Sequence, residues 1–246
     1  MKKKILAFVF AMLPALSLAS GGNVHLDKAN IDVSDKESLQ RGAKLFINNC
    51  LSCHSAEHQR YNRMARDLGM DEKYVIENLM YASEKIGEQM TIAMPADQAK
   101  EWFGAPPPDL TLIARRRGVD WLYTYLRSFY IDESRPFGVN NIVFPNVGMP
   151  HVLWDLQGMQ KAIFKTETDA EGNEHHVFEG FELVQPGSMS PEEYDQAVRD
   201  LVAFLSYMGE PIQLERQRLG IWVLLFLAVL FVLSYALKKE YWKDVH

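Results

Sequence analysis

The most constraining feature of this 246-residue sequence is the pentapeptide Cys50-Leu51-Ser52-Cys53-His54. The C-x-x-C-H pattern is typical of c-type haem attachment, because each thiol can add to a haem vinyl group and the following histidine can bind the iron. These are the only two cysteines in the chain, so no thiol remains for a thiolate zinc site. The alternative is a thioredoxin-like redox motif, which would follow a strand of a βαβ unit that the sequence lacks. We therefore expect one covalent haem c, held by Cys50 and Cys53, with His54 as an axial iron ligand.

The amino terminus has the three parts of a secretory signal peptide. Lys2–Lys4 precede an apolar run, Ile5–Leu18, and Ser17 and Ala19 at the end of this run are small residues at the positions that a signal peptidase reads. We predict a signal peptide over residues 1–19. An uncleaved anchor is the alternative, but the run is short for a membrane span. Export agrees with the haem motif, because this attachment is expected outside the bacterial cytoplasm.

The carboxyl terminus contains a candidate membrane span. Residues 219–237 carry no charge, and their hydroxyl groups are those of Ser234 and Tyr235. As a helix they would extend about 28 Å, enough to cross the hydrocarbon layer. A buried helix of a soluble domain would keep a polar face, which this segment lacks. The sequence predicts a linker at 210–218, a transmembrane helix at 219–237 and a tail at 238–246.

The orientation of this span follows mainly from the haem motif. Lys238, Lys239 and Lys243 after the span only slightly favour a cytoplasmic carboxyl end, because Arg216 and Arg218 precede it. Since haem attachment requires export, we expect a single-pass protein of the bacterial inner membrane. Its haem domain, residues 20–209, would lie in the periplasm and its tail in the cytoplasm.

The predicted haem domain is acidic. Residues 20–209 hold 18 Lys and Arg against 28 Asp and Glu, a formal charge of −10. Such a charge argues against nucleic acid as a partner. It suits electrostatic steering of a basic soluble protein, and it equally suits general solubility.

Two helices frame this domain in the sequence. Ser34 and Glu37 have the spacing of a capping box that opens a helix leading to Cys50. Ser190 and Glu193 form a second capping box, with proline at the first helical position, opening a helix up to Gly209.

The apolar residues of both helices recur at helical spacing, so each helix has a face for a core. In a small cytochrome c fold the first and last helices cross beside the haem, and Gly42 and Phe46 against Tyr194 and Leu201 would suit such a crossing. Two unrelated amphipathic helices are the alternative.

Between these helices we predict three shorter helices, at 71–83, at 110–117 capped by Asp109, and at 121–130 capped by Asp120. A β-hairpin insert is expected within 162–183, around the turn-rich residues 169–173. The expected fold class is therefore mainly α: a class I cytochrome c-like haem domain with a small β-hairpin insert and one C-terminal transmembrane helix.

The sixth iron ligand is less constrained by the sequence. A methionine or histidine opposite His54 would make an electron carrier, whereas an open position would make a gas binder or an enzyme. The candidates are Met94, Met149 and His151. Met94 has the spacing of a minimal cytochrome c, and Met149 requires a larger loop, so the residues alone leave the choice open.

Two further segments carry a family resemblance. Pro107-Pro108-Asp109-Leu110 leads into Arg115 and Arg117, and Asn146-Val147-Gly148-Met149-Pro150 follows at a distance. Together with a cytochrome c core and a lone carboxyl-terminal anchor, these segments resemble the cytochrome c1 family, the haem subunits of the ubiquinol:cytochrome c oxidoreductase (cytochrome bc1 complex). The resemblance covers nearly the whole mature chain.

The resemblance implies a role for each matching residue. Met149 would be the axial ligand opposite His54, Arg117 would pair with a haem propionate, and Pro107 and Pro108 would pack near the ring. Trp121 falls where the family often has a tyrosine near the propionates, so it is a further candidate cofactor contact.

The resemblance also implies a function. The chain would relay single electrons from the Rieske iron-sulfur protein to a soluble or membrane-anchored cytochrome c, with its anchor beside cytochrome b in the lipid bilayer. It would belong to an oxidoreductase complex without making or breaking substrate bonds itself. One alternative is a free-standing anchored cytochrome c that donates to a terminal oxidase. The other is a five-coordinate haem sensor or peroxidase-like protein.

Overall fold

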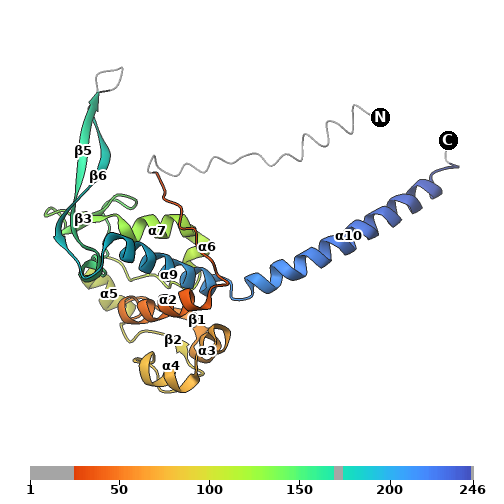
Figure 1. Ribbon diagram of the computed structural model, residues 1–246, viewed down its shortest axis with the longest axis horizontal. Coiled ribbons are helices and arrows are strands. Elements are labelled where there is room, and N and C mark those ends of the chain that lie inside the picture. Colours follow the sequence, from red (N-terminus) through yellow and green to blue (C-terminus); the bar gives the residue numbers. More distant parts are fainter. Residues whose placement is uncertain (1–24, 169–173, 245–246) are drawn as a thin grey trace.

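The computed structural model describes residues 25–168 and 174–244. A helical head carries a projecting β-hairpin and a single long helix, α10, that extends away from it (Figure 1). The predicted signal peptide, residues 1–19, lies outside the described residues.

The head contains short helices and three two-stranded antiparallel sheets within the described residues. The helices are α2 (Lys36–Asn49), α3 (Tyr61–Leu68), α4 (Glu72–Asn78), α5 (Ala96–Phe103), α6 (Ile113–Arg117), α7 (Val119–Arg127), α8 (Trp154–Gln157) and α9 (Pro191–Gly209). The strands pair as β1 (Ala56–Arg60) with β2 (Gln89–Met90), β3 (Phe129–Ile131) with β4 (Val139–Asn141), and β5 (Gly158–Thr168) with β6 (Glu174–Pro186). The mainly α architecture agrees with the predicted fold class.

The first and last helices of the head pack against each other, as predicted (Figure 1). Gly42 of α2 lies so close to α9 that a Cβ there would stand 2.0 Å from the carbonyl oxygen of Asp200. The rings of Phe46 and Phe204 pack beside this contact, with centroids 5.6 Å apart. Gly42 and Phe46 thus lie at the crossing as predicted, with Asp200 and Phe204 as their neighbours on α9. The hydroxyl of Tyr194 donates to the carbonyl of Leu126 at the end of α7.

The two predicted capping boxes have different outcomes. At α9 the box is present: Ser190 accepts from the amide of Glu193, and the Glu193 carboxylate accepts from the amide of Ser190. At α2 the prediction is wrong, because Asp35 is the N-cap and accepts from the amide of Ser38. Ser34 instead donates to Asp32 in a preceding turn.

The helices between them are shorter than predicted. The helix expected at 71–83 is α4, which is capped by Asp71 and ends at Asn78. The helix expected at 121–130 is α7, which ends at Arg127 because the chain then enters strand β3.

The hairpin insert is present and longer than the predicted 162–183. Strand β5 pairs with β6 from Gly158, opposite Pro186, outward to Thr168, opposite Glu174, and the predicted turn at 169–173 lies outside the described residues. The end of the hairpin that joins the head is fixed by Gln160. The side-chain amide of Gln160 donates to the carbonyls of Arg127 and Phe129, at 3.0 and 2.8 Å.

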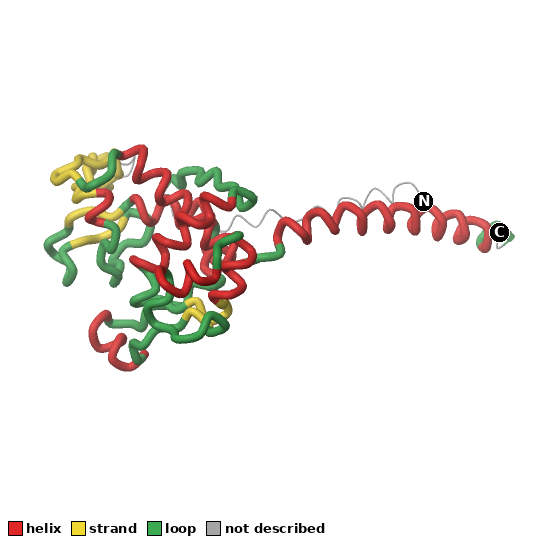
Figure 2. The backbone as a smooth tube through the Cα atoms, turned by 60° about the horizontal axis from the view of Figure 1, so that its bottom comes forward, coloured by secondary structure: helices red, strands yellow, loops and turns green. Residues whose placement is uncertain are grey.

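Helix α10 (Gln213–Tyr241) forms one continuous rod that leaves the head (Figure 2). It is longer than the predicted span at both ends, because it begins within the segment expected as a linker and ends at Tyr241, within the expected tail. Its most apolar stretch has a mean hydropathy of 2.5, and none of that stretch is buried. By length and composition, it is the one helix in the described part of the chain that could cross a membrane.

Candidate haem site

The Cys-x-x-Cys-His motif continues directly from the end of α2. The amide of Cys50 donates to the carbonyl of Phe46, and the amide of His54 donates to the carbonyl of Cys50, each at 2.8 Å. Neither cysteine forms a disulfide. Burial raises the pKa of Cys50 to about 12, so this thiol is neutral near pH 7 and poorly suited to thiolate metal binding.

The ring of His54 is oriented by a backbone carbonyl. Its Nδ1 atom lies 2.7 Å from the carbonyl oxygen of Pro108. Because that oxygen can only accept, Nδ1 carries the proton and Nε2 keeps its lone pair for a metal. Burial lowers the pKa of His54, which favours the neutral imidazole that iron requires.

The loop that supplies this carbonyl is itself anchored beside the motif. The carboxylate of Asp109 accepts from the Ser55 hydroxyl, the Glu57 amide and the Thr111 amide, at 2.8–2.9 Å. Burial alone would raise the pKa of Asp109, but these hydrogen bonds outweigh it and hold the pKa below its ordinary value. Asp109 therefore fixes the Pro-Pro-Asp-Leu loop. The prediction that it caps a helix at 110–117 is wrong, because α6 begins only at Ile113, with Leu112 at the N-cap position.

Met149 is half-buried and has a polar partner. The hydroxyl of Tyr125 donates to its sulfur, with an Oη–Sδ distance of 3.3 Å. Tyr125 is on α7, and sequence analysis did not single it out as a site residue. Its contact with Met149 spans 24 positions, and helical periodicity alone marks Tyr125 only as one of several apolar residues of α7.

Arg117 and Trp121 lie together at the junction of α6 and α7. The guanidinium of Arg117 lies 4.8 Å from the ring centroid of Trp121 and 5.6 Å from that of Phe144. Arg117 is exposed and makes no ion pair with a carboxylate among the described residues. Its charge is therefore available to an anion, as a propionate-binding residue would require.

The two other candidate ligands have different surroundings. Met94 lines a cavity of about 280 Å³ together with Ser55, Pro106 and Pro107, so it also lies near the proline loop. His151 is buried, its ring stacks on Phe129 with centroids 5.0 Å apart, and its Nε2 atom has no hydrogen-bond partner among the described residues.

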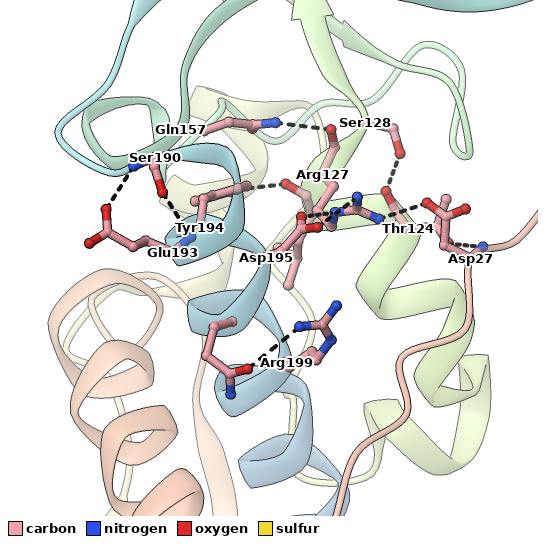
Figure 3. A network of polar contacts seen from close by, with 12 residues as sticks. Asp27, Thr124, Arg127, Ser128, Gln157, Ser190, Glu193, Tyr194, Asp195 and Arg199 are labelled. Atoms are coloured by element: carbon pink, nitrogen blue, oxygen red, sulfur yellow. Dashed lines mark hydrogen bonds and ion pairs between the residues drawn. The ribbon is translucent and has the colours of Figure 1, made fainter.

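A larger cavity of about 1130 Å³ lies elsewhere, between the β5–β6 hairpin and the ends of α7 and α9. None of the predicted haem-site residues lines it. One of its lining residues, Arg127, forms an ion pair with Asp27 at 2.6 Å and another with Asp195 at 2.5 Å (Figure 3). Because the two aspartates satisfy this arginine, the network joins the amino-terminal segment, α7 and α9 as a structural support.

The residues beside the motif fit a covalent haem. Cys50 and Cys53 have the required spacing and form no disulfide, and His54 presents its Nε2 atom in one fixed tautomer. In the described part of the chain, no group of three or more His, Cys, Asp and Glu side chains forms an alternative metal site. The fold and this donor set define a c-type cytochrome with a C-terminal membrane-type helix.

Sequence comparisons identify the family more closely. A sequence model of the Cytochrome C1 family matches residues 27–245. The chain is 55% identical to a cytochrome c1 of Allochromatium vinosum over the full length of both proteins. It is 30% identical to a cytochrome c1 of Blastochloris viridis, covering 98% of this chain and 95% of that protein. It is also 49% identical to a Nitrosomonas europaea protein named ammonia monooxygenase gamma subunit, covering 99% of this chain and 98% of that protein.

The chain belongs to the cytochrome c1 family. It is a membrane-anchored protein with one covalently bound haem c, and it is an electron-carrying subunit of a cytochrome bc1 complex. The sequence prediction of family, cofactor and fold class is thus confirmed.

Proposed function

We propose that this chain accepts single electrons from a Rieske iron-sulfur protein and passes them to a soluble or membrane-anchored cytochrome c, next to cytochrome b. The observation that carries the proposal is the preset His54 ring, whose Nδ1 atom is 2.7 Å from the Pro108 carbonyl. A ring held in this tautomer can bind iron without reorienting. Family membership supplies the assembly in which such a centre would act.

In this proposal four side chains hold the haem. Cys50 and Cys53 would form the two thioethers, and His54 and Met149 would bind the iron. When bound, the haem supplies the one-electron chemistry, an iron that alternates between ferrous and ferric states. Both donors are neutral, and a thioether paired with imidazole would favour the ferrous state and so a relatively high potential.

The other site residues would position the haem and balance its charge. Arg117 would bind a propionate from its place over Trp121. Pro107 would pack near the ring. Pro108 would pack there too, and its carbonyl fixes the axial imidazole. Asp109 has no contact with the haem in this scheme; it anchors the loop that carries Pro108.

We further propose that the head lies in the periplasm, that residues 219–237 cross the inner membrane and that residues 238–246 reach the cytoplasm. The haem motif supports this orientation, because the covalent attachment is made after export. The long unburied helix α10 supports the span.

A haem and subunit inventory of the purified assembly tests the function. The chain, isolated from its native membrane in mild detergent, should co-purify with b-type haem and an iron-sulfur protein, and the assembly should reduce cytochrome c with quinol. A chain that carries haem c but brings no b-type haem would instead be the free-standing donor to an oxidase. Co-purification with ammonia-oxidising activity would favour the role in the name of the Nitrosomonas europaea relative.

A further inference from the structure

We propose that Tyr125 is a positioning residue that sets the electron affinity of the haem through the sulfur of Met149. The inference rests on the proposed function, in which Met149 is the axial ligand. It assigns a role to a residue that the C-x-x-C-H motif, the proline loop and the distant methionine segment do not include.

The first observation is the hydrogen bond itself. The Tyr125 hydroxyl lies 3.3 Å from the Met149 sulfur, and only 9% of Tyr125 is exposed. A buried tyrosine hydroxyl normally has a partner. Among the described residues, the sulfur is the acceptor that the structure gives to this hydroxyl. A thioether sulfur is a weak acceptor.

The second observation is that the Tyr125 ring is held on two sides. Trp121 stacks on it, with centroids 4.9 Å apart and planes inclined by 10°, and Phe129 packs edge-on at 5.2 Å. The side chain of Asn141 donates to the carbonyl of Tyr125 at 2.8 Å, which fixes the backbone behind the ring. The hydroxyl is therefore directed at the sulfur by packing that does not depend on the hydrogen bond.

The electronic consequence follows from the two lone pairs of a thioether sulfur. One pair would bind the iron, and the other accepts the Tyr125 hydrogen. The hydrogen withdraws electron density from the sulfur, which makes it a poorer donor to ferric iron, whereas ferrous iron needs that donation less. Hydrogen bonds to ligand atoms are one of the means by which proteins set haem potentials. The hydroxyl thus raises the reduction potential.

The test is Tyr125→Phe in the full chain within its complex. We expect the variant to keep the weak far-red charge-transfer band of a methionine-bound ferric haem, at a shifted wavelength. Its midpoint potential should fall. At a fixed applied potential near the midpoint, the ratio of reduced to oxidised haem should fall roughly two- to tenfold, the range expected for one neutral hydrogen bond. For a one-electron couple, tenfold corresponds to about 59 mV.

Tyr123→Phe is the matched control. Tyr123 is on the same helix and only 2% exposed, but its ring lies under the guanidinium of Arg127, at 4.5 Å. The control makes the same chemical change without touching Met149, so its potential should equal that of the parent protein. Equal shifts in both variants would overturn the inference, because repacking of α7 would then explain them.

The remaining outcomes separate the inference from the proposed function. An unchanged potential in Tyr125→Phe, with the charge-transfer band retained, would overturn the role of Tyr125 and leave Met149 as the ligand. Loss of the band in that variant would also overturn it, because the hydroxyl would then be needed for ligation and would not tune a stable bond. Absence of the band in the parent protein would reject Met149, and the inference with it.

Discussion

At the scale of single residues, the choice between Met149 and Met94 decides the axial pair. Met149 has a fixed polar partner in Tyr125, whereas Met94 lies in a small cavity beside Pro106 and Pro107. We expect Met149→Leu to keep the covalent haem and open the sixth position, so that carbon monoxide binds readily to the reduced protein. Met94→Leu should leave the spectrum nearly unchanged. Carbon monoxide titration of both variants checks this, and exchanged outcomes would identify Met94 as the ligand.

Asp109 allows a second prediction at this scale. Replacing it with alanine leaves the Ser55 hydroxyl and the amides of Glu57 and Thr111 without their acceptor. The free energy of unfolding should fall by about 1–3 kcal/mol, the cost of unpaired polar groups. Urea unfolding of the haem-loaded protein in detergent, followed by haem absorbance, measures this loss. Asp97→Ala, at an exposed position of α5, is the control, and equal stability of the two variants would show that the loop does not depend on Asp109.

The residue-scale chemistry was only partly accessible from the sequence. Cys50, Cys53 and His54 form a local pattern whose spacing fixes their geometry, so the motif could be recognised directly. The contact of His54 with the Pro108 carbonyl could not be recognised in this way. The two residues are 54 positions apart, and a sequence carries no signal for a backbone acceptor. Tyr125 was missed for the same reason: its partner is set by the loop that carries Met149, and no local rule places that loop.

At the scale of elements, sequence rules worked best where a signal was local and had no competitor. Ser190 and Glu193 cap α9 as predicted, because the proline directly after Ser190 fixes the first helical position. At α2 the same rule chose Ser34, but Asp35 lies one residue closer to the helix and a carboxylate is an equally good N-cap. The end of α7 was also misplaced, because β-pairing of Phe129 with Asn141 overrides helix propensity.

The crossing of α2 and α9 gives a prediction for these two elements. Gly42→Ala would put a methyl group 2.0 Å from the carbonyl oxygen of Asp200 and 2.8 Å from the Cβ atom of Phe204. The helices would have to separate, at a cost of about 1–3 kcal/mol or more. Thermal unfolding of the haem-loaded protein should show a lower midpoint. Gly180→Ala, in strand β6, meets no atom within 4 Å and serves as the control. A midpoint for Gly42→Ala equal to that of the control would mean that the helices do not pack this closely.

At the scale of the whole molecule, the head and the long helix are structurally separable. The buried core consists of residues from the head, and none of the described residues of α10 is buried. The link between them is polar: Glu210 pairs with Arg115 of α6 at 3.5 Å and with Arg216 at the start of α10. Both arginines are exposed and Glu210 is partly exposed, and ion pairs of this kind contribute little to folding. The proposed haem ligands all lie before residue 210.

This separation predicts the behaviour of a truncated chain. A stop after Pro211 removes α10 and keeps the whole buried core, so the head should fold, retain its covalent haem and appear in the soluble fraction. Its reduced visible spectrum should match that of the full chain, because no haem-site residue is lost. Fractionation of cells expressing each form, followed by haem staining, makes the comparison. A truncated head that stays in the membrane fraction would show that another segment binds the bilayer, and a head without haem would show that α10 is needed for assembly of the site.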